Sequence, residues 1–158
     1  MLATMTNAAI SRAENRSATP AIDIGMLILR GTLGLIFFAH GAQKLLGWFG
    51  GKGLFATLVA FEDGMGIPPF LGYMAIFTEF FGGIALMFGV LSRLAGLGIA
   101  VTMLVAIFKV SLKGGFFMEN KGMEYNLALL AMAICVVLIG PGMIALASKV
   151  KRLPFFLH

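Results

Sequence analysis

The sequence predicts an all-α fold, a four-helix transmembrane bundle with a short interfacial segment between the first and second spans. Three observations carry this prediction. Of the 158 residues, 59% are hydrophobic and 12% are charged, whereas soluble domains have about 45–50% and about 25%. Four apolar stretches are long enough to cross about 30 Å of hydrocarbon as helices. None of them alternates apolar and polar residues as a barrel strand does, and open strands leave unpaired backbone groups in lipid.

The composition also excludes several classes of protein. Intrinsic disorder needs few apolar residues, and a disulfide scaffold needs more than the single Cys135. The net charge of +5 comes from scattered residues, without a basic cluster interleaved with aromatics, so no nucleic-acid partner is expected. One cysteine gives no dithiol motif and no iron–sulfur cluster. The two histidines, one of them the terminal His158, predict no metal site and no haem ligand pair, and no covalently bound cofactor is predicted.

The first part of the chain is expected to contain a tail, a span and an interfacial segment. Residues 1–20 are polar and lack the continuous apolar core of a signal peptide, so we expect a disordered cytoplasmic tail. The first span follows at residues 22–46. Residues 47–66 are still apolar, but the stretch at 54–61 is too short to span. It is expected to lie at the interface as a short amphipathic helix or a re-entrant cap.

The rest of the chain supplies three further spans. We expect these spans at residues 67–90, 94–112 and 124–147, with a tight turn at 91–93 and a second loop at 113–123. The transmembrane domain as a whole then covers residues 21–148, and a basic C-terminal tail covers residues 149–158.

Cationic residues set the expected orientation of this bundle. An even number of spans places both termini on one side, and that side carries more cations than the other. Its cations are Arg12, Arg16, Arg93, Lys149, Lys151 and Arg152, against Lys52, Lys113 and Lys121 in the opposite loops. Because cytoplasmic loops carry the excess of Lys and Arg, both termini are expected in the cytoplasm.

Ionisable residues within the spans are the candidate functional residues. Each costs about 2.5–3.5 kcal/mol near the centre of a membrane helix, so each needs a reason to be there. A rise of about 1.5 Å per residue places Arg30 of the first span level with Glu79 of the second, which predicts a buried ion pair. The same count gathers a second set near the outer face as ligand-binding candidates: His40, Lys44, Lys109 and Glu124.

Small residues accompany these charges on the predicted helix faces. At helical spacing each charge shares a stripe with small residues, which mark close helix contacts in membranes. We therefore expect the charges to face the bundle interior. The stripes join Arg30 with Gly34, Phe37, Gly41 and Lys44; Glu79 with Ala75, Gly82 and Gly83; Lys109 with Gly98, Thr102 and Ala106; and Glu124 with Ala128, Ala131 and Cys135.

Structural explanations stay open for each of these residues. In the structural explanation, the Arg30–Glu79 pair is no more than a register lock between two helices. His40 is then a hydrogen-bonded interior residue. Residues near the interface have topological explanations, which are snorkelling for Lys44, Lys109 and Glu124 and an interfacial aromatic belt for Trp48 and Tyr125.

A set of short motifs resembles a known family. The run RGTLGLIFFAHGAQKL begins at Arg30, EFFGG begins at Glu79, and EYNL begins at Glu124. The motifs WFGG, GIPP, GVLSR, GGFF and GPG lie between or after them. Together, over about residues 22–145, they resemble the DoxX family of small four-span bacterial membrane proteins.

This resemblance implies a multi-pass protein of the bacterial cytoplasmic membrane with a link to redox chemistry. The family is named for its similarity to a subunit of a thiosulfate:quinone oxidoreductase. Its members are commonly labelled oxidoreductases, and some are linked to oxidative-stress or thiol-handling complexes. The resemblance assigns no catalytic role to Arg30, His40, Lys44, Glu79 or Glu124, which are present at the family positions.

Two functions of different classes are consistent with these residues. The first is a component of a membrane redox system, quinone-linked or linked to thiols and oxidative stress. It would hold a quinone at the outer cluster, where His40 and its neighbours handle protons, and a soluble redox partner would supply electrons. The second is a non-catalytic membrane anchor for a soluble partner, or a small-solute transporter whose path the charges line. Membrane lipid is a partner in both, and a homo-oligomer is open.

Overall fold

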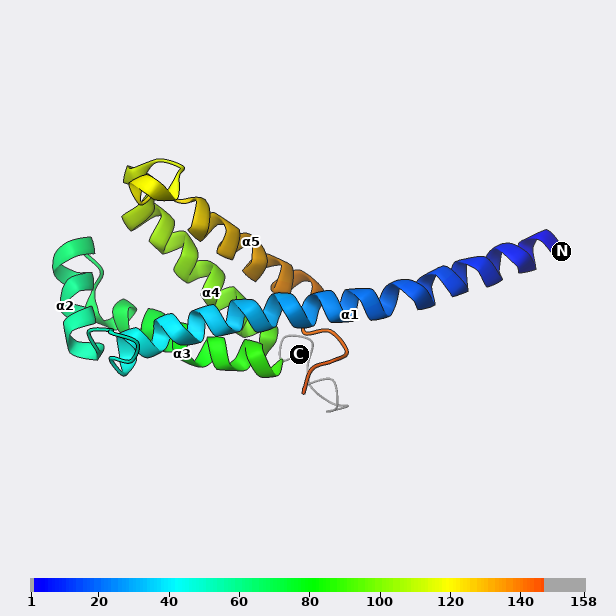
Figure 1. The fold of residues 1–158 in the computed structure, drawn as a ribbon, viewed down its shortest axis with the longest axis horizontal. Coiled ribbons are helices and arrows are strands. Elements are labelled where there is room, and N and C mark those ends of the chain that lie inside the picture. Colours follow the sequence, from blue (N-terminus) through cyan, green and yellow to red (C-terminus); the bar gives the residue numbers. More distant parts are fainter. Residues whose placement is uncertain (1, 147–158) are drawn as a thin grey trace.

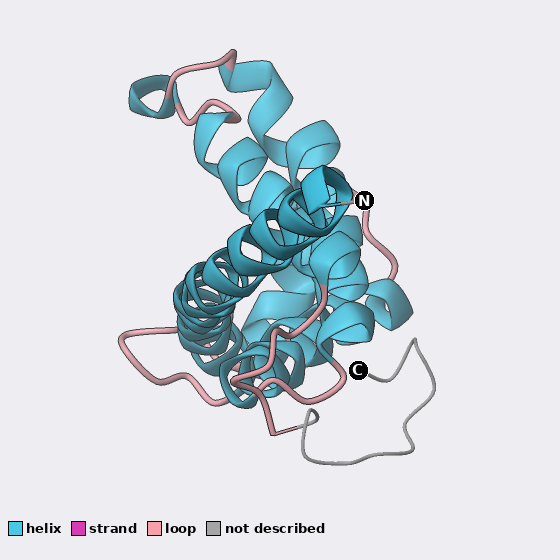
Figure 2. Ribbon diagram, turned by 90° about the vertical axis from the view of Figure 1, so that its right-hand side faces the viewer, coloured by secondary structure: helices cyan, strands magenta, loops and turns pink. Residues whose placement is uncertain are grey.

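The structure is a computed structural model and describes residues 2–146. Every regular element in this part of the chain is a helix, and Figure 2 shows only helices and loops. The elements are α1 (Leu2–Leu45), α2 (Leu54–Met65), α3 (Pro69–Phe88), α4 (Ser92–Ala106), the π-helical η1 (Ile107–Ser111), the 3-10 helices η2 (Leu112–Gly114) and η3 (Met118–Asn120), and α5 (Glu124–Ile139). The predicted all-α fold is confirmed.

Three of these helices are long and apolar enough to cross a membrane: Pro20–Leu45, Pro69–Phe88 and Ser92–Gly114. The predicted fourth span, residues 124–147, is shorter than expected. Its helix α5 has 16 residues, or about 24 Å at 1.5 Å per residue, against about 30 Å of hydrocarbon. It ends at Ile139 because Gly140 and Gly142 take positive φ angles of 91° and 74° on either side of a proline, which a helix cannot continue through.

The start of α1 differs from the expected disordered tail. The helix runs without a break from Leu2 to Leu45, with Pro20 inside it. The segment before Pro20 is rich in alanine, the residue with the highest helix propensity, and a helix satisfies its own backbone hydrogen bonds. In Figure 1 this part of α1 projects beyond the other helices. The predicted tail at 149–158 lies outside the described residues.

The helices pack as two pairs, α1 with α3 and α4 with α5, and α3 joins the pairs by contacting α4. In Figure 1 the α4–α5 pair runs obliquely to the α1–α3 pair. The α1–α3 contact is close because glycines line it. A Cβ atom placed on Gly34 or on Gly83 would lie 2.7 Å from the carbonyl oxygen of the other. The small-residue faces predicted for the first two spans are therefore confirmed as a helix contact.

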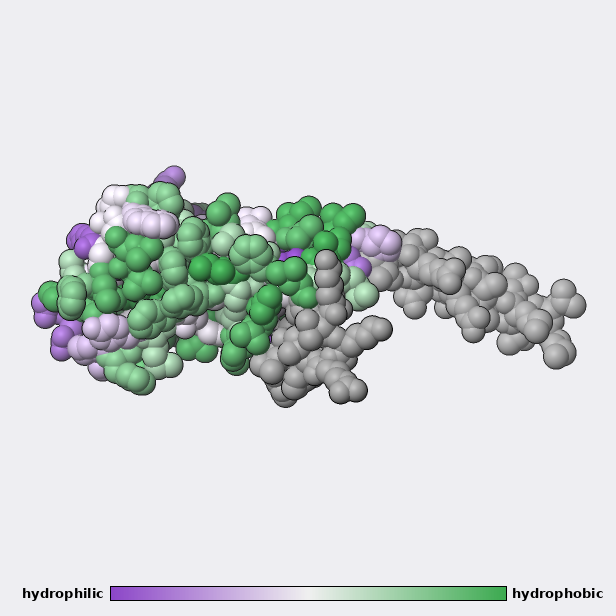
Figure 3. Space-filling view, turned by 90° about the horizontal axis from the view of Figure 1, so that it is seen from below, coloured by the Kyte–Doolittle hydropathy of each residue, from purple (hydrophilic) through white to green (hydrophobic). Residues whose placement is uncertain are grey.

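The core lies between the four long helices, and the outside of the bundle is apolar. The most deeply buried side chains of this core cluster are those of Leu33, Phe37, Leu86, Ile99, Ala133 and Val136. Large apolar side chains are exposed on every one of these helices, including Leu35, Phe81, Val101 and Leu138. Figure 3 shows this apolar surface along the bundle, with hydrophilic residues gathered at the end where α2 lies. Such a surface contacts lipid.

The bundle has two ends that differ in their charged residues. At the end where α3 stops at Phe88 and α5 stops at Ile139, Arg30 and Arg93 are found; we name it the arginine end. At the opposite end, α1 stops at Leu45 and the helices α2, α3 and α5 begin. Because Lys44 lies there, we name it the lysine end.

Candidate functional site

Arg30 is buried at the arginine end, and within residues 2–146 its side chain donates hydrogen bonds only to main-chain oxygens. Its side chain is 2% exposed. Nη1 donates to the carbonyls of Leu86 and Met87 at 2.8 Å each, Nε donates to Pro141 at 3.1 Å, and Nη2 donates to Ile144 at 2.5 Å. None of these partners is a carboxylate. The predicted Arg30–Glu79 ion pair is therefore wrong.

The register of α1 against α3 explains the error. Gly41 of α1 packs on Phe80 of α3, and Gly34 packs on Met87, so Glu79 lies level with Ala42. Twelve residues separate Ala42 from Arg30, which is about 18 Å along a helix axis. The part of α1 before Arg30 extends past the end of α3.

That part of α1 instead faces the chain that follows α5. The Oδ1 atom of Asp23 accepts a hydrogen bond from the backbone N–H of Met143 at 2.8 Å. The backbone N–H of Leu146 donates to the carbonyl of Phe88 at 3.2 Å. The chain after α5 thus closes the arginine end, and Arg30 holds it against α3.

Arg93 has a similar role on α5. Its Nη1 donates to the carbonyl of Val137 at 2.5 Å and of Leu138 at 3.3 Å, and Nη2 donates to that of Ile139 at 3.4 Å. These are the last carbonyls of α5, where the helix dipole is negative and orphan acceptors remain. Arg30 does the same at the end of α3, so both arginines cap helix C-termini.

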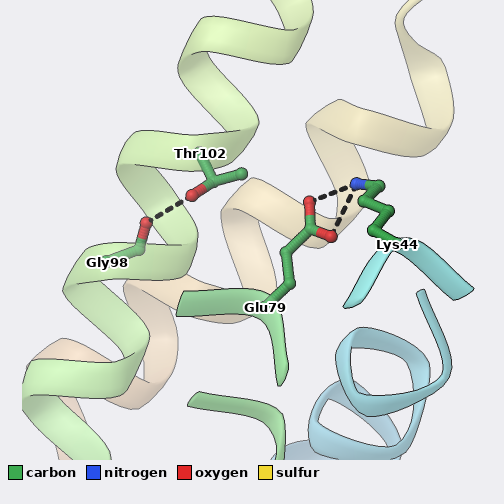
Figure 4. Close-up of polar contacts among 4 residues, drawn as sticks. All are labelled: Lys44, Glu79, Gly98 and Thr102. Atoms are coloured by element: carbon green, nitrogen blue, oxygen red, sulfur yellow. Dashed lines mark hydrogen bonds and ion pairs between the residues drawn. The ribbon is translucent and has the colours of Figure 1, made fainter. Parts of the chain in front are cut away.

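The lysine end holds an ion pair between side chains of α1 and α3. The Nζ atom of Lys44 lies 2.5 Å from both Oε1 and Oε2 of Glu79, and Figure 4 shows the two side chains pointing at each other. The Glu79 side chain is 4% exposed and the Lys44 side chain is 27% exposed. The carboxylate is therefore withdrawn from solvent, while its ammonium partner can be reached. The glycine contacts between α1 and α3 also explain this pairing. Gly41 packs on Phe80 and so sets Glu79 opposite Ala42, two residues before Lys44 on α1.

An aromatic ring from α2 completes the surroundings of Lys44. Its Nζ atom lies 5.7 Å from the centroid of the Phe61 ring, within the range of a cation–π contact. The three groups come from three helices, α1, α2 and α3. Sequence reasoning placed α2 at the interface but gave it no residue at the site.

The other predicted ligand-binding candidates do not join Lys44. His40 and Lys109 are exposed, and within residues 2–146 the side chain of neither makes a hydrogen bond or an ion pair. Glu124 accepts a hydrogen bond from the backbone N–H of Met118 at 2.7 Å, which fastens the loop before α5. Within residues 2–146, none of these three side chains makes a hydrogen bond or an ion pair with Lys44 or Glu79.

Uncharged polar residues contribute contacts that the sequence analysis missed. Asn126 of α5 donates through Nδ2 to the Oγ atom of Ser111 at 2.5 Å, which joins the start of α5 to η1. The Thr102 hydroxyl donates to the carbonyl of Gly98 in its own helix at 3.0 Å (Figure 4). Trp48 and Tyr125, the predicted interfacial aromatics, are both exposed at the lysine end.

The chemistry open to this site follows from its donors and acceptors. Lys44 has three N–H donors, of which Glu79 takes two at most, so one remains for a ligand oxygen. The ring of Phe61 lies beside the Lys44 ammonium as an apolar neighbour. Across residues 2–146 no group of three or more His, Cys, Asp or Glu side chains could hold a metal ion. The site is suited to an apolar molecule that carries an oxygen acceptor.

Comparisons with known proteins agree with this description. The sequence matches the DoxX family over residues 25–112. It is 35% identical over 126 residues to a Bacillus subtilis (strain 168) protein named "Putative oxidoreductase CatD". The matched region covers 80% of this chain and 87% of the relative. It is 30% identical over 126 residues to an Escherichia coli (strain K12) protein named "Inner membrane protein YqjF", over 76% of this chain and 87% of the relative. No solved structure matches the chain significantly.

Proposed function

The chain belongs to the DoxX family, and we propose that this membrane protein is a quinone-linked component of a redox system that binds the quinone at the Lys44–Glu79 pair. The name of the Bacillus subtilis relative, an oxidoreductase, supports redox chemistry. The apolar setting of the pair supports a ligand drawn from the membrane.

The observation that carries the proposal is the unequal burial of the two charges. Glu79 is 4% exposed and Lys44 is 27% exposed. A buried ion pair adds little stability over an apolar contact, because desolvation offsets the attraction. Ionisable residues inside a membrane therefore mark functional sites more often than structural ones. Because the Lys44 ammonium is partly exposed beside a buried carboxylate, it can exchange one hydrogen-bond acceptor for another or pass on a proton.

Each group has a defined task in this proposal. The ammonium of Lys44 donates a hydrogen bond to a carbonyl oxygen of the ring and stabilises negative charge that builds up on it. Glu79, as the carboxylate of the ion pair, keeps Lys44 charged and positioned, and the two protons that reduction of a quinone to a quinol consumes come from solvent. A soluble redox partner supplies the electrons, as the sequence analysis expects from a chain with a single cysteine.

Trp48 provides the assay for this proposal. It is the only tryptophan in the chain, and it follows closely after Lys44 at the lysine end. Quinones quench tryptophan fluorescence, so titration of purified protein in nanodiscs with duroquinone reports binding near Trp48. We expect saturable quenching by the wild type. Lys44→Met removes a charged hydrogen bond worth about 1.5–3 kcal/mol and should weaken binding about 10- to 100-fold.

Lys109→Met is the matched control for this titration. It removes another membrane-embedded lysine that is exposed on α4–η1 and makes no contact with the site. Its duroquinone affinity should equal that of the wild type. Equal affinities for wild type and Lys44→Met would contradict the proposal.

A second candidate function, a membrane anchor for a soluble partner, is favoured by the part of α1 that projects beyond the bundle (Figure 1). A pull-down from solubilised membranes, with lipid extraction of the eluate, separates the two functions. Co-purifying quinone supports the redox component. A stoichiometric soluble protein without quinone supports the anchor.

We also propose that both termini lie in the cytoplasm of a bacterium, with the lysine end on the outer side. Single cysteines placed in residues 113–123 of a Cys135→Ser background test this orientation. They should react with an impermeant thiol reagent added to intact cells. Reaction only after the membrane is ruptured would reverse the orientation.

A further inference from the structure

Helix α2 brings one aromatic side chain to the Lys44–Glu79 pair and holds it there by a close contact with α3. The contact is at Gly72, where a Cβ atom would lie 2.8 Å from Leu58 Cδ2 and 3.4 Å from Phe61 Cδ2. The absence of a side chain at Gly72 therefore lets α2 approach α3 closely. As a result, the ring of Phe61 is fixed beside Lys44 by two helices.

The Lys44 ammonium lies between two different groups. The Glu79 carboxylate oxygens are 2.5 Å from Nζ, and the centroid of the Phe61 ring is 5.7 Å from it. A ligand oxygen that accepts the remaining N–H of Lys44 lies near the Phe61 ring, because the ring centroid is 5.7 Å from Nζ. Flat rings stack at centroid separations of about 4.5–7 Å, so a flat ligand ring can stack on Phe61, whereas a puckered saturated ring loses the stacking contact.

We propose that Phe61 is the specificity-determining residue of this site, and that it selects flat para-quinone rings over saturated cyclic diketones. This inference rests on the proposed function and deepens it. Lys44 recognises an oxygen, which both classes of ligand possess. Phe61 recognises the ring, which distinguishes them.

The same helix offers a matched control residue. Phe55 lies on α2 six residues before Phe61, on a different face, and it is 79% exposed. It makes no ring contact or cation–π contact within residues 2–146. Removing the Phe55 ring alters the apolarity of α2 as much as removing that of Phe61, but leaves the site untouched.

The test measures selectivity rather than affinity alone. Duroquinone and cyclohexane-1,4-dione both carry two para oxygens, but only duroquinone is a flat conjugated ring. Duroquinone binding is followed by quenching of Trp48, and dione binding by competition against duroquinone. The proteins compared are wild type, Phe61→Leu, Phe61→Tyr and Phe55→Leu, each checked for helix content and monodispersity.

We expect Phe61→Leu to lose about three- to tenfold in duroquinone affinity, the typical contribution of an aromatic pair. Its dione affinity should be unchanged, so its selectivity for the flat ring should fall by the same factor. Phe61→Tyr and Phe55→Leu should keep the wild-type selectivity. Phe61→Met repeats the loss of the ring with an unbranched apolar side chain, so a folding defect of the leucine variant leaves the test intact.

Two outcomes would overturn the inference, and they can be told apart. If the wild type binds duroquinone but Phe61→Leu and Phe61→Met keep its selectivity, the role of Phe61 is refuted and the proposed function stands. If the wild type shows no saturable quenching, the proposed function fails and the inference fails with it.

Discussion

The two ends of the bundle hold cations in opposite ways. At the arginine end, Arg30 and Arg93 donate to carbonyls of the main chain. At the lysine end, Lys44 meets the carboxylate of Glu79. In the first kind of contact the acceptor keeps its charge at every pH, since a carbonyl does not titrate. The second kind joins two titratable groups, one of them reachable.

This difference supports a structural role for the arginines and the proposed ligand-binding role for Lys44. Arginine keeps its charge in proteins, and its planar group can satisfy several acceptors at once. It is suited to closing two helix ends permanently. Lysine is a compact charge on a flexible stem, so Lys44 can release one acceptor and take another. The arginine end therefore stabilises the fold, and the lysine end is where we propose that the ligand binds.

The largest effect should follow from a change at the arginine end. Arg30→Met removes four hydrogen bonds from a charged donor, each worth about 1.5–3 kcal/mol, and should lower the free energy of unfolding by about 5 kcal/mol or more. Thermal unfolding in detergent, followed by circular dichroism, measures it. Arg30→Lys should not restore stability, because an ammonium cannot replace the planar fork. A silent Arg30→Met would show that the arginine end does not hold the fold.

A smaller effect is expected from single changes at the lysine end. Lys44→Met leaves the buried Glu79 carboxylate unpaired and should cost about 3 kcal/mol of stability. Glu79→Gln leaves Lys44 able to reach water, so its cost should be about 1 kcal/mol. In the double variant most of the loss should be recovered. A cycle between Arg30 and Glu79 serves as the control, since residues this far apart should show additive effects.

The smallest effects should come from the exposed ionisable residues. His40→Ala and Lys109→Met each should change stability by no more than about 0.5 kcal/mol, as is usual for surface positions. Their duroquinone affinities should match the wild type. Loss of binding in His40→Ala would return the site to the outer cluster that the sequence predicts.

The sequence was sufficient for the fold class and for the α1–α3 contact. Composition and stretch length identify membrane helices, and the stripe from Arg30 to Gly41 correctly marks the face of α1 that packs on α3. The position of Arg30 along the bundle axis relative to Glu79 does not follow from the ends of the apolar stretches. The first of these stretches contains a part of α1 that passes beyond α3, and no apolarity pattern reveals it.

The stripe on α5 shows the second limit of sequence reasoning. Ala128 and Ala131, expected inside, are exposed, while Leu129, Leu130 and Ala133 are buried. The helix α5 is apolar on all sides, because lipid and the protein interior both favour apolar side chains. Its sequence therefore has no periodic pattern that distinguishes its buried face from its lipid-facing one. Glu124, at the start of α5, accepts a hydrogen bond from Met118 in the loop before the helix.

The central claim is that the Lys44–Glu79 pair is a ligand site rather than a lock between helices. The Lys44→Met/Glu79→Gln double variant tests it most directly, because its fold is expected to recover while its ammonium and carboxylate are absent. Duroquinone titration of this variant in nanodiscs, followed by Trp48 quenching, is the measurement. We expect the double variant to unfold at a temperature close to that of the wild type and to bind duroquinone at least about tenfold more weakly. Wild-type affinity in the stable double variant would contradict it.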